Sequence, residues 1–220
     1  MIKIKDYDKN KGKLSFSTDM SVSMANAIRR SVLEIPVMAI DDIEISKNDS
    51  ALYDEIIAHR LGLIPIKTDK LIKETKFKLQ VVGPRTVYAT DLKPSVETDL
   101  KLPIVILDNE QELEVVANAR LGRGIDHIKY SPGLVFFRHN LDEVLEYVTI
   151  NDEGKVSFDE DDLKNNNVSD EIINKVKKLS NVNELLFNIE SWGQIEPREI
   201  FLKSVDALNK NLDELHKAVK

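Results

Sequence analysis

Apolar and polar side chains alternate at the start of the chain, and the spacing then becomes helical. Alternation over residues 2–4 and again over 14–16, on either side of a polar, turn-rich run, predicts two strands joined by a turn. Asp19 or Ser21 can cap a following helix that ends at Pro36. The apolar face of this helix comprises Met24, Ile28, Val32 and Ile35.

The middle of the chain is predicted to form a small, mainly β unit. Ser50 can cap a short helix that ends near Gly62. Apolar residues on its expected inner face are Leu52, Ile56, Ile57 and Leu61. Strand-like runs separated by glycine and proline turns follow at residues 77–82, 86–89, 104–107, 113–121 and 134–138.

A strand over 185–192 and a long helix after Pro197 are predicted for the end of the chain. Apolar residues recur in this helix at alternating spacings of four and three, the pattern of a helix packed lengthwise on another helix. This seam comprises Phe201, Val205, Leu208, Leu212, Leu215 and Val219. It can pack on the chain's own first helix, on a partner subunit, or on both.

The amino-acid composition argues against several classes of function. The 220 residues contain 38 acidic and 31 basic side chains, a net charge of −7, which argues against broad nucleic-acid binding. Cysteine is absent, which excludes disulfides, thiolate metal sites and a cysteine nucleophile. Neither a secretory signal nor an apolar run long enough to span a bilayer is found, so we expect an intracellular, soluble protein.

Residues 151–183 are the least regular by composition. Acidic side chains cluster over 159–162, and asparagines repeat over 165–167. One amphipathic patch, 172–179, indicates a short helix. We therefore expect a flexible surface insertion with that helix in it.

A glycine-containing turn at residues 122–127 superficially resembles a phosphate-binding loop. A histidine replaces the third glycine that such a loop requires, and another strand follows in place of a clear helix. A structural turn is the favoured interpretation. The alternative is a small-molecule enzyme site that uses Asp126 and His127. The spacing of the histidines does not indicate a metal site.

Two features suggest docking to other proteins. Arg29 and Arg30 follow Asn26 on a helix whose other face is apolar, and arginine is favoured at interfaces. His59 and Arg60 lie in an apolar helix end that runs into Pro65. For His59 and Arg60, the side-chain chemistry is equally compatible with a structural role and with a docking edge.

Four segments together resemble one family. Residues 21–36 are similar to a motif of the RNA polymerase α family, and residues 54–65, DEIIAHRLGLIP, resemble the matching motif of its archaeal and eukaryotic members, the D subunit and the third-largest subunit. Residues 119–133 and the run FNIESW at 187–192 with the last helix also fit the archaeal member. The resemblance covers nearly the whole chain, with the motifs in the family's order.

The resemblance implies an α+β fold with a discontinuous α/β dimerisation domain, residues 1–47 and 180–220, and an inserted mainly β domain, 48–179. It implies a non-catalytic assembly platform of DNA-directed RNA polymerase that pairs with the small α-like subunit L, then with subunit N and the largest and second-largest subunits. Asn26, Arg29, Arg30, His59 and Arg60 would contact a large subunit. The heterodimer interface would comprise Met24, Ile28, Val32 and the seam.

The resemblance also bears on cofactors and location. Because cysteine is absent, neither the iron–sulfur domain of many archaeal relatives nor a cysteine-ligated zinc is expected, and the polymerase Mg²⁺ would belong to the large subunits. We expect a cytoplasmic chain with little direct nucleic-acid contact, no membrane association and no small-molecule substrate of its own. A stand-alone binding protein that homodimerises through the seam is the main alternative.

Overall fold

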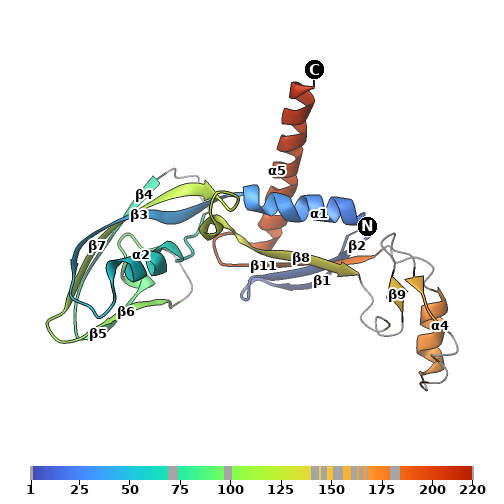
Figure 1. The fold of residues 1–220 in the computed structure, drawn as a ribbon, viewed down its shortest axis with the longest axis horizontal. Coiled ribbons are helices and arrows are strands. Elements are labelled where there is room, and N and C mark those ends of the chain that lie inside the picture. The colour runs from blue at the N-terminus through green and yellow to red at the C-terminus, as the bar shows by residue number, and fades with distance from the viewer. Residues whose placement is uncertain are drawn as a thin grey trace.

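The computed structural model describes most of the chain. The described residues are 2–68, 74–96, 101–139, 144, 148–150, 156–159, 163, 166, 168–178 and 184–219. Two sheets with separate cores lie side by side, and a smaller third unit lies beyond the first sheet (Figure 1). No helix in these ranges is long and apolar enough to cross a membrane.

The first sheet is antiparallel and carries its helices on one face. Its strand order is β1 (Lys3–Asp8), β2 (Lys13–Thr18), β11 (Leu185–Ser191) and β8 (Gly133–His139). The helices are α1 (Val22–Ser31), the short 3-10 turn η1 (Val32–Glu34) and α5 (Pro197–Ala218). Phe16, Phe187 and Phe137 are directly paired across three strands, and their rings stack with centroids 5.3 and 6.0 Å apart. The Phe201 ring of α5 meets two of them edge-on, which fixes the helix on the sheet.

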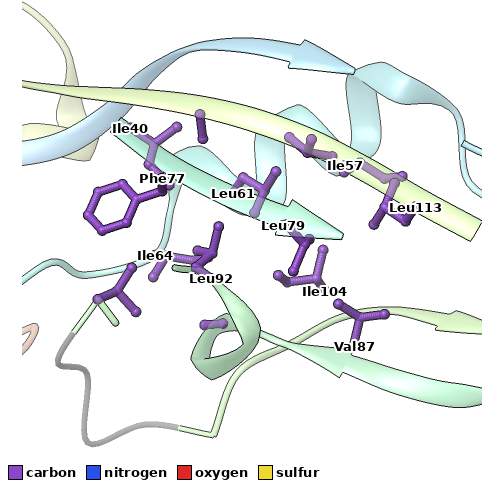
Figure 2. Close-up of a cluster of buried hydrophobic side chains, with 14 of the residues drawn as sticks. Ile40, Ile57, Leu61, Ile64, Phe77, Leu79, Val87, Leu92, Ile104 and Leu113 are labelled. Carbon is purple, nitrogen blue, oxygen red and sulfur yellow. The ribbon is translucent and has the colours of Figure 1, made fainter. Parts of the chain in front are cut away.

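The second sheet carries the inserted, mainly β part of the chain. Its order is β3 (Pro36–Asn48), β7 (Glu112–Arg123) and β4 (Glu74–Val82). Beside it lie α2 (Asp54–Gly62), the hairpin of β5 (Arg85–Tyr88) and β6 (Pro103–Leu107), and the 3-10 turns η2 (Ala89–Asp91) and η3 (Ile128–Tyr130). Figure 2 shows side chains from the helix, the sheet and the hairpin meeting in one core, including Ile57, Leu79 and Ile104.

Strand β3 contributes to both cores. Val37 and Ala39 are buried in the first core, whereas Met38 and Ile40 are buried in the second. Because successive side chains of a strand point to opposite faces, one strand start can serve two cores at once. Ile43 and Ile45 alternate with acidic residues, a pattern typical of a strand. The observed strand begins already at Pro36, a position that tolerates proline because it is the first residue of the strand.

The third unit consists of short elements. These are the two-stranded β9 (Thr149–Ile150) and β10 (Val156–Ser157) and helix α4 (Asp170–Lys178), with buried Val156, Ile173 and Val176. The predicted helix at 172–179 is thereby confirmed, two residues earlier than expected. About half of the segment expected to be flexible, 151–155, 160–162 and 179–183 included, lies outside the described residues.

One sequence-based expectation needs correction. Ser50 does not cap α2, because its hydroxyl bonds to Asn48 and the helix begins only at Asp54. The expected domain boundaries at 47/48 and 179/180 stay a prediction, and strand pairing crosses both of them. Strand β8, within 48–179, pairs with β11 of the first sheet, and β3, assigned to the dimerisation domain, pairs with β7 of the second. These pairings are non-local, so local patterns carry no signal for them.

The stacked phenylalanines generate a prediction about stability. Replacing the fully buried Phe187 by alanine is expected to lower the free energy of unfolding by about 3–5 kcal/mol, because it removes buried area and leaves a cavity. Phe136→Ala, on the opposite, exposed face of the same sheet, is the matched control. Urea unfolding of both variants measures the difference, and equal effects would contradict the proposed importance of the stack.

Candidate subunit interface

Helix α1 presents one buried and one exposed side. Ser21 caps it, because its hydroxyl accepts a hydrogen bond from the Met24 backbone N–H at 3.2 Å. Of the three α1–η1 residues expected at a heterodimer interface, Ile28 and Val32 are buried in this chain's own core. Only Met24 is exposed and open to a partner.

The two arginines of α1 lie in different environments. The Arg29 guanidinium is half-buried, with Nε and Nη2 each 3.4 Å from Asn26 Oδ1, so Asn26 holds it against the helix. The Arg30 side chain is exposed. Arg29 is therefore positioned within the fold, and Arg30 is the one more available to a neighbouring protein.

The first half of helix α5 is anchored to the first core. Pro197 occupies its first turn, and Ile200 and Ser204 are fully buried. Phe201, Val205 and Leu208, the first three seam residues, pack partly buried against the same core. At the end of this half, the Asn211 amide donates to both carboxylate oxygens of Glu34, each at 2.8 Å.

The second half of α5 extends away from the body of the molecule. Figure 1 shows the helix crossing α1 and projecting beyond it to the C-terminal end. Every residue from 212 to 219 is exposed, including the last three seam residues, Leu212 at 54%, Leu215 at 60% and Val219 at 79%. The seam is therefore divided: its first half packs within the chain, and its second half lacks a partner among the described residues.

Strand β1 adds a second uncovered apolar surface. Ile4 is paired with Phe16 and Tyr7 with Leu14, so both side chains lie on the face of the sheet that carries the helices. They are nevertheless exposed, Ile4 at 69%, since α1 and α5 do not reach over this edge strand. The sequence pattern predicted the strand but not this surface. The sequence feature that could have indicated this surface was the alternation of isoleucine with lysine.

His59 and Arg60 occupy the exposed side of α2. The Arg60 guanidinium donates to the Ile104 backbone carbonyl at 2.6 Å and so ties the helix to β6. Tyr53, at the N-cap of this helix, and Ile56 within it are also exposed. Because α1 lies over the first sheet and α2 beside the second, the five expected large-subunit contacts form two separate groups (Figure 1).

An ionic cluster around Asp41 ties strand β3 to β7 and to η3. Its carboxylate accepts hydrogen bonds from Lys129 Nζ at 2.5 Å and the Tyr130 hydroxyl at 3.0 Å, and Arg120 Nε lies 2.5 Å from it. The Lys129 hydrogen bond is the main reason why the pKa of Asp41 is lowered. Burial, more than the hydrogen bond to Asp41, raises the pKa of Tyr130. No sequence signal indicated this cluster, because its members lie up to 89 residues apart.

The turn at residues 122–127 has a structural geometry. A side chain at Gly122 would meet the Tyr130 ring at 2.5 Å, so only glycine fits there. His127 Nδ1 accepts from the Lys129 backbone N–H at 3.2 Å and thereby starts η3. Among the described residues, no group of three or more histidine, aspartate or glutamate side chains is placed to hold a metal ion.

Comparison with known proteins decides the family. The model of the RNA polymerase Rpb3/Rpb11 dimerisation domain matches residues 16–212. The chain belongs to this family. The resemblance of the sequence motifs and the α+β fold class are thereby confirmed.

Curated relatives are archaeal proteins named DNA-directed RNA polymerase subunit Rpo3. The chain is 42% identical to that of Pyrococcus horikoshii over 63% of this chain and 60% of the relative. For Natronomonas pharaonis the identity is 32% over 90% and 89% of the two chains, and for Methanocaldococcus jannaschii 39% over 67% and 81%. The chain thus matches only about three fifths of the Pyrococcus horikoshii relative's length.

The Asp41 cluster predicts a pH-dependent contribution to stability. Because the folded pKa is lower than the usual 3.8, the contribution is complete above that value and is lost as the pH falls through the folded pKa. Asp41→Asn is expected to lower the free energy of unfolding at pH 7 by roughly 1.5–3 kcal/mol, the worth of hydrogen bonds to a charged group. The difference from the unmodified chain should shrink below about pH 4.

Urea unfolding between pH 7 and pH 3 measures this difference. Asp42→Asn, at the exposed neighbouring position, is the matched control and should leave stability nearly unchanged. A destabilisation by Asp41→Asn that stayed constant down to pH 3 would show that the charge of Asp41 is not the cause.

Proposed function

We propose that this chain is a non-catalytic assembly platform of an archaeal DNA-directed RNA polymerase. It pairs with the small α-like subunit L through the exposed half of α5 and the uncovered face of β1. Subunit N and the two large subunits then join this heterodimer, and nucleotidyl transfer with its Mg²⁺ takes place on the large subunits. The cytoplasm is the expected location.

The observation that carries the proposal is the divided seam. Three large apolar side chains on the free half of α5, at least half exposed, continue a pattern whose first half is packed. Burying such a side chain is worth about 1.5–3 kcal/mol, so a second chain that covers this stripe and β1 gains a substantial apolar interface. The family description as a dimerisation domain and the relatives' names as polymerase subunits support the same conclusion.

Docking of the second-largest subunit is assigned to Asn26, Arg29 and Arg30 of α1, and contacts with a large or platform subunit to His59 and Arg60 of α2. The exposure of Arg30 and of both α2 residues supports this assignment. Met24, exposed on the same helix but on a different side from these arginines, belongs to the proposed heterodimer surface. Ile28 and Val32 support that surface from beneath.

The first test concerns the heterodimer. Leu212→Glu with Leu215→Glu should abolish a stable one-to-one complex with subunit L, because both substitutions place charge on the apolar stripe. The control, Lys210→Glu with Lys217→Glu, adds more negative charge but lies about 140° or more around the helix from both leucines. Light scattering after size exclusion of the chain co-expressed with L gives the complex mass.

The expected result is a heterodimer with the control pair and none with the leucine pair. A monomer or homodimer that ignores L in the unmodified chain would refute the platform. A homodimer would instead favour the stand-alone binding protein.

The second test concerns the large subunit. Arg30→Glu should weaken docking of the second-largest subunit and leave the heterodimer with L intact, because the side chain is exposed and its charge is reversed. Lys78→Glu, an exposed position on β4, is the control for charge reversal alone. Yield of polymerase reconstituted from separate subunits measures docking. Normal yield with Arg30→Glu would exclude this role for the α1 arginine.

A further inference from the structure

Helix α5 presents a second row of side chains, which the predicted seam does not describe. Leu202 is not a seam residue and is 52% exposed, and it lies about 160° around the helix from the fully buried Ile200 and Ser204. From Leu202 a row with spacings of three and four continues on this side to the C-cap. We call this row the outer face of α5, and it comprises Leu202, Val205, Asn209, Leu212, His216 and Val219.

The outer face is uncovered along the whole helix. All of its members except the partly buried Val205 are exposed, although the first half of α5 is anchored to the first core by its other side. The uncovered apolar surface therefore begins at Leu202, about two turns after the start of the helix, and not only where the helix leaves the body.

The spacing of the outer face indicates a helix as its occupant. Its members repeat every seven residues, the period of a helix packed lengthwise on another helix. Asn209 interrupts the apolar members in the middle of the row. A polar residue at such a position weakens association but selects the partner and the register, because it requires a polar group opposite it.

Two acidic side chains flank the outer face on one side. Asp206 and Asp213 are seven residues apart and directly follow Val205 and Leu212, so both lie on the same flank. Both are exposed, and neither is ion-paired within the part of the chain that the structure describes. The other two acids of α5 are paired with lysines of the helix at 3.4 and 3.9 Å. This flank therefore offers unpaired negative charge to another molecule.

A second copy of this chain would not supply the missing counter-charge. If two outer faces packed as antiparallel helices, the same two acids would face each other. If they packed as parallel helices, the acids would face Leu208 and Leu215, which flank the row on its other side. The charges therefore favour a different chain, with basic side chains at the facing positions.

We propose that the outer face receives one amphipathic helix of subunit L, which lies along α5 from Leu202 onward. This helix carries basic side chains opposite Asp206 and Asp213, and one of its polar side chains pairs with the Asn209 amide. The description of the family as a dimerisation domain supports a subunit as the occupant. The inference rests on the proposed function and extends it, because it names further contact residues and the chemistry of the partner's surface.

Competition for a limiting amount of L tests where the contact begins. A variant and the unmodified chain are refolded together with L, and native mass spectrometry gives the ratio of the two heterodimers. Leu202→Glu is expected to lose this competition severalfold, because it places a charge on the apolar row. Leu63→Glu, at a leucine exposed to the same degree (53% against 52%) but outside α5, should compete equally with the unmodified chain.

Two neighbouring acids test the charge of the partner. Asp213→Lys should lose the same competition severalfold at low salt and much less at about 1 M salt, where charges are screened within about 3 Å. Glu214→Lys is the matched control, since it reverses the same charge at an adjacent exposed residue that lies about 160° around the helix from Leu212. It should compete nearly as well as the unmodified chain.

The outcomes separate the inference from the proposed function. Failure of the unmodified chain to form a heterodimer with L would refute the proposed function itself. A normal heterodimer, with equal competition by Leu202→Glu and Leu63→Glu or by Asp213→Lys and Glu214→Lys, would overturn only the inference about the outer face.

Discussion

The alternation of side chains at the start of β3 is the constraint on which the rest of the structure depends. Val37 and Ala39 belong to one core and Met38 and Ile40 to the other, so four consecutive residues of one strand fix the two sheets relative to each other. A one-residue slip in register would exchange the two sets of side chains. The Asp41 cluster follows immediately and ties the same strand to β7 and η3, so an apolar and an ionic contact act at one junction.

Helix α5 illustrates how one regular sequence can have two roles. Its seam repeats without interruption, yet the first half is covered by the stacked phenylalanines and neighbouring residues while the second half is exposed. The change occurs at the Asn211–Glu34 contact, after which the described part of this chain offers no further packing surface to the helix. The same apolar repeat therefore packs within the chain in the first half of α5 and forms the proposed intermolecular surface in the second half. The edge strand β1 shows the same incomplete cover on the sheet.

Sequence patterns predicted the local elements well and the long-range arrangement poorly. The period of the last helix placed five of the six seam residues within α5, with Val219 at its C-cap, because period depends only on neighbours along the chain. It could not show where the helix leaves the body, which depends on the reach of α1 and η1. Pairing of β8 with β11 and the Asp41 cluster likewise join residues far apart in sequence. The family was recognisable because each of its motifs is contiguous in the sequence. The partner subunits were inferred only from that family resemblance.

The anchoring of α5 has a consequence for the thermodynamics of association. Residues 212–219 amount to about two turns, which would not form a stable helix in water by themselves. They are helical here because they extend a helix already nucleated and held by its first half. The backbone of this stripe therefore loses its conformational entropy when the chain folds. The free energy of association with an incoming chain does not have to offset that loss a second time. Association is thereby coupled to the integrity of the first core, so that a partly folded chain would bind weakly.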